Sequence, residues 1–263
     1  MTSVSIRTVH DVTALSAVAG YFSDVWQTPP STPPYPAEVL HSLVHAGGAV
    51  HAAYDGARLA GAAVAVFGPP ASGEAYSLVA AADQGLGFEV KQAQRAWFVE
   101  RGARIMRWTF DPLVGRNARF NLVKLGAVGT EYLVDFYGPM SDGVNDGDES
   151  DRLSVTWALT APAPAYPASS PRPDETPDRD CAPTTHPAPD GGPLACRDLD
   201  DRHVWCRVPD DIVRIRAADP ALALAWRRAV REVFTKAFAD GFTATGMSRD
   251  GWYTLTRSSE DAL

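Results

Sequence analysis

The chain has 263 residues, of which 45% are hydrophobic, so it is long enough for one large globular domain or for a domain with a smaller second unit. Its formal net charge of -8 and the lack of a basic stripe argue against nucleic acid as a partner. No apolar run is long enough for a transmembrane helix, and the polar start MTSVSIRTVH lacks a secretion signal, so we expect a cytoplasmic protein with no membrane partner.

The first 160 residues alternate between strand and helix patterns. Residues 4–10 alternate as a strand, and Asp11 is placed to cap a helix that runs to about Trp26. A proline-rich loop, QTPPSTPPYP, cannot be helical, and helical spacing returns after it in AEVLHSLVHAGG. Two apolar strands then flank Asp55-Gly56, which is a strong signal for a hairpin turn.

Further strands and helices follow in the same alternation. They are a strand over 75–81, a helix over 83–103, a strand over 104–110, a helix over 114–127, and strands over 130–138 and 152–159. The resulting order, β-α-α-β-β-β-α-β-α-β-β, predicts an α+β fold in which a mixed sheet is flanked by helices.

The composition changes at Ala161. From there to Ala195, ten prolines stand among Ser, Thr, Asp and Glu, which predicts a linker over 161–200 with no core of its own, mobile from about Ser169 to Leu194. The linker would separate a domain at 1–160 from a C-terminal αβ unit at 201–263.

The C-terminal unit shows a strand, a helix and a hairpin. The strand pattern is HVWCRVP, the helix opens at Asp219-Pro220 and runs to about Ala239, and FTATGM and WYTLTR form the hairpin. Because so small a unit buries little apolar surface alone, we expect it to pack on the first domain. Three arginines of its helix, Arg227, Arg228 and Arg231, are expected to form mostly a solvated face.

The cysteines give no support for a metal site. Cys181, Cys196 and Cys206 match no CxxC spacing, although His186 and His203 lie near them in the sequence. We therefore expect free thiols and no metal.

Three residue-dense stretches resemble the GNAT superfamily of CoA-dependent N-acyltransferases. They are WTFDPL..RNA.FNL.KLGA at 108–127, FYG.MSDG.N.G...DRL.V.W at 136–157, and DPALALAWRRAVREVF..AFADGF in the C-terminal helix. More narrowly, the chain resembles the branch whose genes often accompany N-succinylamino-acid racemases. The resemblance covers nearly the whole chain except the linker, and it implies a GNAT-type mixed sheet with the C-terminal unit packed on it.

In GNAT proteins the fourth and fifth strands separate, and acyl-CoA inserts between them while the helix after the fourth strand presents its N-terminus to the pyrophosphate. A helix N-terminus suits an anion because its first N–H groups have no partner within the helix. The family's pyrophosphate loop reads Gln/Arg-x-x-Gly-x-Gly/Ala, whereas this chain reads AAADQGLG, with Ala82 in the basic or amide position. The cofactor-side residues that the resemblance implies are Gln84, Gly85, Gly87, Phe88, Asn117, Asn121 and Lys124.

The catalytic groups are open between alternatives. Many GNAT enzymes carry a tyrosine acid where this chain has Leu122, so Tyr137 is the substitute, with a packing role as the alternative. An ammonium cannot attack a thioester, so a base is needed, and Glu74 and Asp111 are the candidates. Asp111 serves equally as a helix cap, and Lys124 as a solvated side chain.

The candidate substrate contacts come from one strand and one acidic loop. Arg152 is suited to grip a substrate carboxylate with two hydrogen bonds, or else to pair with the neighbours of Asp151. The loop itself reads equally as a flexible acidic turn. The substrate-side residues that we name are Trp108, Asp142, Asn145 and Arg152.

The resemblance implies transfer of an acetyl or succinyl group from acyl-CoA, as co-substrate, to the amine of a small amino-acid-like molecule. Attack would be direct, with no covalent enzyme intermediate. The alternative is a GNAT-fold protein that has lost CoA use and carries out elimination, hydrolysis or cyclisation, or binds a small molecule, in the same cleft. The oligomeric state stays open, and a homodimer is one expectation.

Overall fold

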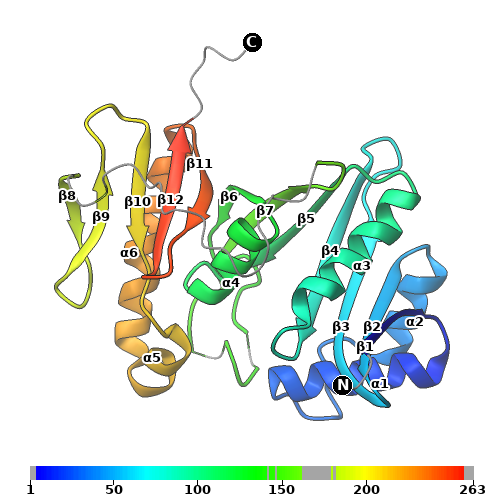
Figure 1. The fold of residues 1–263 in the computed structure, drawn as a ribbon. Coiled ribbons are helices and arrows are strands. Elements are labelled where there is room, and N and C mark those ends of the chain that lie inside the picture. Colours follow the sequence, from blue (N-terminus) through cyan, green and yellow to red (C-terminus); the bar gives the residue numbers. More distant parts are fainter. Residues whose placement is uncertain (1–3, 141, 146, 162–178, 180–181, 258–263) are drawn as a thin grey trace. The chain divides into compact units, whose positions relative to one another are not determined.

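The computed structural model describes residues 4–140, 142–145, 147–161, 179 and 182–257 (Figure 1). The chain divides into two compact units. Unit 1 comprises Met1–Trp108, Asp142–Val144 and Ala158–Ala161, and unit 2 comprises Thr109–Ser141, Asn145–Trp157 and Pro162–Leu263. The main boundary therefore falls at Trp108, inside the domain expected at 1–160, and the C-terminal segment shares a unit with residues 109–141.

Unit 1 is a mixed sheet flanked by helices. Its elements are β1 (Val4–Val9), α1 (Val12–Trp26), α2 (Ala37–His45), β2 (Ala49–Asp55), β3 (Arg58–Phe67), β4 (Glu74–Ala82), α3 (Gly87–Glu100) and the first part of β5 (Ile105–Phe110). Strands β1 to β4 are antiparallel neighbours in chain order, and β5 is parallel to β4. The element order expected for this region is confirmed.

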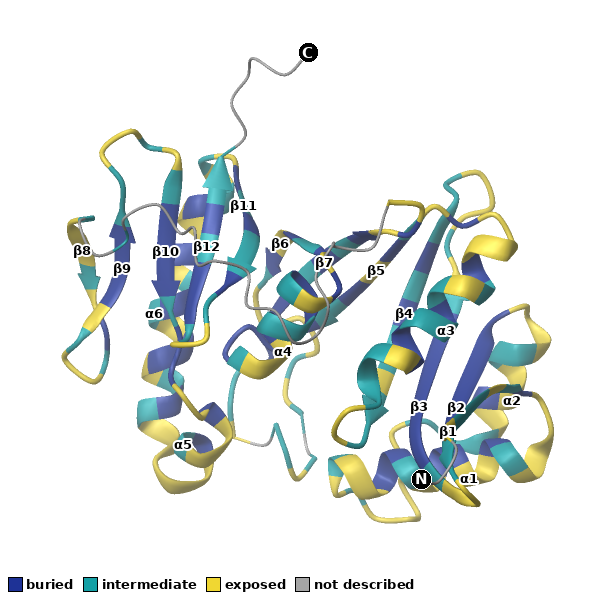
Figure 2. Ribbon diagram, in the orientation of Figure 1, coloured by how far each residue is buried: buried dark blue, intermediate teal, exposed yellow. Residues whose placement is uncertain are grey.

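Side chains of β2 and β3 alternate between two apolar layers, as the pleat requires. One face packs with α1 and α2 through a cluster that includes Leu15, Phe22, Leu40, Val50 and Val64. The opposite face packs against α3, where Ala53 and Ala63 meet Val90. Both faces of β3 are thus covered along its middle, which is why residues Ala60–Ala65 are buried (Figure 2).

Unit 2 is an antiparallel sheet with helices of its own. Its elements are α4 (Gly115–Arg119), the π-helix η1 (Phe120–Lys124), β6 (Val128–Leu133), β7 (Arg152–Ala158), β8 (Thr184–Pro187), β9 (Pro193–Arg197), β10 (His203–Arg207), α5 (Ile212–Ala218), α6 (Pro220–Ala239), β11 (Phe242–Met247) and β12 (Trp252–Arg257). The strand order is β7-β6-β11-β12-β10-β9-β8. Helix α6 buries Trp226, Val230, Phe234 and Ala237 at helical spacing, and the Phe234 ring lies 5.0 Å from that of Tyr253.

The end of the expected linker is folded, contrary to the sequence analysis. Strands β8 and β9 pair with each other, and β9 also pairs with β10, with Leu194 and Cys196 buried. Those strands lie within 161–200, so that part of the linker prediction is wrong. The part that falls on residues 162–178 lies outside the described residues. No helix in the described ranges is long and apolar enough to cross a membrane.

Candidate functional site

Strands β4 and β5 pair only at their first residues. The parallel partners are Glu74 with Ile105, Ala75 with Met106 and Tyr76 with Arg107. From Ser77 to Ala82, β4 keeps its pairing with β3 but has none with β5. The two strands therefore separate after three residue pairs, and the second half of β4 has one unpaired edge. Separation of these strands is what an acyl-CoA site requires.

The loop after β4 leads directly into the start of α3. Gly85 has a φ of +96°, which a side-chain-bearing residue adopts only with strain, and a Cβ built there meets nothing within 4 Å. No side chain caps the helix at Leu86. Gln84 and Gly85 are exposed, and Gly87 and Phe88 are half-buried. The first turn of α3 thus begins beside open backbone, an arrangement that suits an anionic ligand.

A cation that the sequence analysis missed lies at this loop. Arg58, at the start of β3, donates to the Asp83 carboxylate at 2.6 Å, and its side chain is 62% exposed. Tyr21 of α1 also lies 3.3 Å from Asp83, and its burial together with that carboxylate raises the pKa of Tyr21 to about 12. Arg58 therefore brings a guanidinium to the loop, where Ala82 supplies none, and this guanidinium is paired with Asp83 and lies 3.9 Å from Asp55.

The most unusual group in unit 1 is Lys91 on α3, which is 3% exposed. Its Nζ donates to Ser77 Oγ and to Gln94 Oε1, both at 3.0 Å, and lies 4.0 Å from the ring centroid of Trp108. Burial lowers the pKa of Lys91 to about 7. The Nε2 atom of Gln94 is buried without a hydrogen-bond partner. Neither Lys91 nor Gln94 was singled out from the sequence.

Asp111, proposed as a base, is held in a buried ion network of unit 2. Arg227 donates to both its oxygens at 2.7 and 3.0 Å, and Arg216 donates to Oδ2 at 3.0 Å. The same arginines also bind Asp148. Burial alone would raise the pKa of Asp111, but Arg227, Arg216 and the Leu113 N–H together lower it to about 2. A carboxylate so placed favours a structural role over that of a base.

The arginines of α6 are not a solvated face as a group, which corrects the sequence analysis. Arg227 is 1% exposed, and Arg231 binds the carboxylates of Asp151 and Glu149. Arg228 alone of the three has a largely exposed side chain, and it pairs with Glu149 at 2.9 Å. These contacts link residues about 80 positions apart in the chain, so no local pattern could reveal them.

The two amides expected on the cofactor side have different surroundings. Asn117 in α4 is exposed, whereas Asn121 in η1 is 5% exposed, and Lys124 is exposed with its Nζ 6.0 Å from the Phe120 ring. The Leu125 N–H bonds to the Phe120 carbonyl, five residues back, so the helix widens to π geometry at this point. Turns of this kind are often found at functional sites.

Tyr137 and Arg152 lie together in unit 2. Tyr137 sits in the turn after β6, half exposed, with its hydroxyl 3.2 Å from Thr109 Oγ1 and its ring 5.1 Å from the Arg152 guanidinium. Arg152 is 7% exposed and donates to the Asp151 carbonyl and to Met140 Sδ. Among the described residues, no carboxylate forms an ion pair with Arg152.

The remaining candidates are spread over the chain. Glu74 pairs with Arg107 at 3.0 Å, and both are partly exposed. Asp142 accepts from the Val144 N–H in a short turn, and Asn145 is half-buried in the same region. Trp108 is 6% exposed and lies against Lys91. In the described residues, no group of three or more His, Cys, Asp or Glu is arranged to hold a metal ion.

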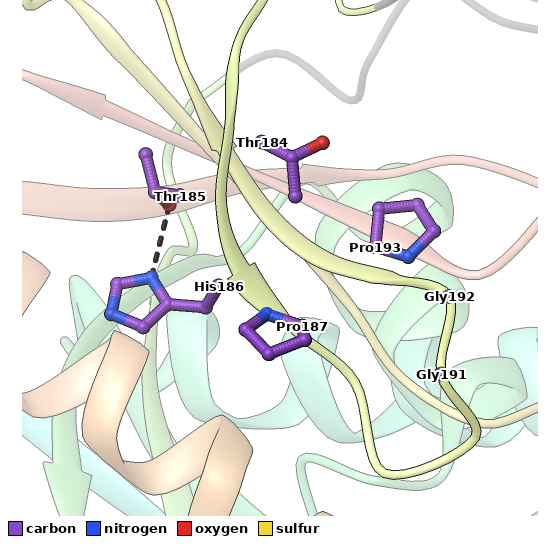
Figure 3. Close-up of a pocket in the computed structure, with 7 residues that line it drawn as sticks. All are labelled: Thr184, Thr185, His186, Pro187, Gly191, Gly192 and Pro193. Carbon is purple, nitrogen blue, oxygen red and sulfur yellow. Dashed lines mark hydrogen bonds between the residues drawn. The ribbon is translucent and has the colours of Figure 1, made fainter.

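Two hollows lie apart from the predicted residues. One, of about 360 Å³, is formed by the β8–β9 hairpin, where His186 Nδ1 lies 3.0 Å from Thr185 Oγ1 (Figure 3). The other, of about 500 Å³, is lined by α1, the proline-rich loop and the start of α2. In the part of the chain that the structure describes, His186 is the one titratable side chain that lines the first hollow, and Asp24 and Glu38 are those that line the second.

No protein-family model matches the sequence, and no curated protein matches it. Solved structures do resemble it. An N-acetyltransferase from Staphylococcus aureus Mu50 aligns with a TM-score of 0.49 and 12% identity over 60% of this chain and 99% of that chain. The ribosomal-protein-S18-alanine N-acetyltransferase from Escherichia coli aligns with a TM-score of 0.47 and 15% identity over 62% and 99%. At these identities and TM-scores, the likenesses assign no activity to this chain.

Proposed function

We propose that this chain is an acyl-CoA-dependent N-acyltransferase of GNAT type that transfers an acetyl or succinyl group to the amine of a small amino-acid-like substrate. One observation carries the proposal. Pairing between β4 and β5 ends after three residue pairs, and the unpaired edge of β4 leads to an α3 N-terminus with no side-chain cap.

The residues present fit acyl-CoA. Free backbone groups along Ser77–Ala82 offer hydrogen bonds to an extended amide-containing arm, as strand edges do for peptides. The first turn of α3, with Gly85 preceding it, suits phosphate oxygens, and the exposed Arg58 adds a cation to the loop. These groups would hold the cofactor, and the cofactor would supply the activated acyl group.

The chemistry requires proton transfer at two atoms. The neutral amine attacks the thioester carbon, the carbon–sulfur bond breaks, and the acyl group ends in an amide while the thiolate takes a proton. We propose that Glu74 takes the proton of the amine, directly or through water, because its single pair with Arg107 is partly exposed, whereas Asp111 is buried and bound by Arg227 and Arg216. Tyr137 is the proposed acid, since the residue is half exposed and, among the described residues, its hydroxyl is hydrogen-bonded to Thr109.

Arg152 supports an acceptor that carries a carboxylate. Its guanidinium is buried, and its acceptors among the described residues are a carbonyl and a thioether. The neighbouring Tyr137 ring accepts no N–H in the plane of the guanidinium, so N–H groups of Arg152 are left to donate to a ligand. An Arg–carboxylate pair adds direction as well as affinity, because the two N–H groups match the two oxygens. An amino acid provides both the amine and the carboxylate that this arrangement suits.

A second candidate function is supported by Asp83. Its carboxylate lies in the loop that would receive phosphates. The negative charge of Asp83 repels a bound phosphate unless the paired Arg58 offsets it. If the offset is incomplete, the same residues would act on a small molecule without CoA, by elimination, hydrolysis or cyclisation.

A thiol-release assay with matched acceptors tests the proposal. Acetyl-CoA or succinyl-CoA is offered with amino acids and with their methyl esters, and the product is identified by mass spectrometry. We expect N-acyl amino acids as products, and we expect the esters to react more slowly. Arg152→Gln should lower kcat/KM roughly 10- to 100-fold, because the substrate carboxylate then loses a charge-assisted hydrogen bond. Absence of thiol release with every pair of donor and amine would favour the second candidate.

A further inference from the structure

Buried side chains of unit 1 form a cluster that holds more hydrogen-bond donors than acceptors. Lys91 Nζ already donates to the side-chain oxygens of Ser77 and Gln94, each at 3.0 Å. The Gln94 Nε2 group has no acceptor, although Gln94 is 0% exposed. No acidic side chain in the described ranges pairs with Lys91, whose pKa is lowered by burial alone. The cluster therefore lacks an oxygen that carries negative charge.

Leaving such donors unpaired is costly, so a folded protein retains them where they bind something. The other buried titratable group on this side of the sheet does not fill the need. His51 of β2 is 2% exposed, and burial, followed by Arg101, His10 and Lys91, lowers its pKa to about 4, so it is neutral near pH 7. Glu74, on β4, is paired with Arg107.

The cluster lies where the two strands cease to pair. Ser77 is the first residue of β4 beyond the last partner, and Trp108 is the first of β5. Five residues of extended strand, or about 17 Å, separate Ser77 from Ala82 at the loop before α3. A ligand that places its anionic end at the start of α3 and extends along β4 thus brings its far end to Lys91.

We propose that Lys91, Gln94 and Ser77, against the ring of Trp108, form a buried binding site for a ligand oxygen that carries negative charge. Two sources share this chemistry, a carboxylate and the polarised carbonyl of a thioester. The carbonyl source rests on the proposed function, and the carboxylate source does not. Once the oxygen is bound, Lys91 is held as the ammonium, because an opposite charge favours that form.

Lysine-selective NMR tests the site without an activity assay. The chain has only three lysines, Lys91, Lys124 and Lys236, so each side-chain resonance is assigned by single substitution. The pKa of Lys91 is measured alone and with acetate, CoA and acetyl-CoA. We expect acetate or acetyl-CoA to raise it from about 7 to roughly 9 or above, and CoA without an acyl group to leave it unchanged. Binding should then weaken about tenfold for each pH unit between about 7 and 9, and level off above the pKa of the bound state.

The ligands distinguish the sources. A response to acetate assigns a carboxylate site, and a response to acetyl-CoA alone assigns the thioester carbonyl. Gln94→Leu should reduce the response severalfold, whereas Gln92→Leu, on the same helix outside the cluster, should not. Should Gln94→Leu fold poorly, Ser77→Ala replaces it.

The inference is overturned if neither ligand moves Lys91 while calorimetry shows that acetyl-CoA binds, a result that leaves the proposed function intact. If acetate moves Lys91 and no CoA species binds, the site stands and the proposed function fails.

Discussion

Replacing Lys91 by Met should stabilise the protein at neutral pH, the opposite of what a core substitution usually does. The ammonium is buried with no carboxylate partner, and burial lowers its pKa from the ordinary value of 10.5 to about 7. That difference corresponds to roughly 5 kcal/mol of free energy that the folded state loses by holding the charge. Methionine has a similar length and fills the same space without a charge.

The stability gained by Lys91→Met should be smaller than the roughly 5 kcal/mol that burial of the charge costs. Without Lys91, the side-chain oxygens of Gln94 and Ser77 lose their donor, which costs about 1–3 kcal/mol. We therefore expect Lys91→Met to raise the free energy of unfolding by about 2 kcal/mol at pH 7. Lys236→Met, at an exposed position of α6, should leave it within about 0.5 kcal/mol.

The pH dependence has a definite sign. Because the folded pKa lies below the unfolded one, the unfolded chain binds more protons between about pH 7 and 10.5, and wild-type stability rises across that range. The advantage of Lys91→Met is thus complete at pH 7 and below, and disappears above about pH 10.5. Urea denaturation at several pH values measures it. An unchanged or lowered stability at pH 7 would refute the reasoning, since it would mean that Lys91 carries a stabilising contact.

Three further outcomes are expected. Asp111→Asn should lower the free energy of unfolding by about 3 kcal/mol at pH 7, because it leaves the buried charge of Arg227 without this carboxylate. The loss should shrink as the pH falls from about 4 towards 2, where Asp111 of the wild type becomes protonated. Asp210→Asn, which changes an exposed carboxylate, should leave the free energy of unfolding unchanged. A base role instead predicts lost turnover at unchanged stability. Arg152→Gln should raise KM for an amino acid more than for its ester, in the thiol-release assay. Gly85→Ala should lower both stability, by about 1 kcal/mol, and CoA affinity in calorimetry, whereas Gly102→Ala, also at positive φ, should lower only stability.

Helix caps and the hairpin turn were predicted correctly from the sequence, because each depends on residues close together in the chain. Asp11 accepts from the Ala14 N–H and Asp219 from the Leu222 N–H, as expected for residues that open helices. The turn at Gly56 joins β2 to β3. Capping and turn formation depend on residues three or four apart, so the sequence carries the information.

Structure fixed by distant partners was missed. Strands β8 and β9 are short and proline-bounded, and they form because β9 pairs with β10, a contact that composition does not reveal. The π geometry of η1 was likewise not expected from the sequence.

For the site, the sequence indicated the region but not the unusual residue. The separation of β4 from β5 was expected, and the roles assigned to the loop and to Arg152 stay predictions. Lys91 was overlooked because a lysine on a helix is usually solvated. One signal was present, since Lys91, Gln94 and Phe98 follow the spacing of a single helix face and all three are buried.

The proposed use of CoA is tested most directly by calorimetric titration with CoA, acetyl-CoA and succinyl-CoA. We expect one ligand per chain, with binding weakened by Arg58→Gln because that side chain supplies the exposed cation at the loop before α3. The absence of binding to all three, up to a Kd of about 1 mM, would contradict the account and assign the unpaired edge of β4 to a ligand of another kind.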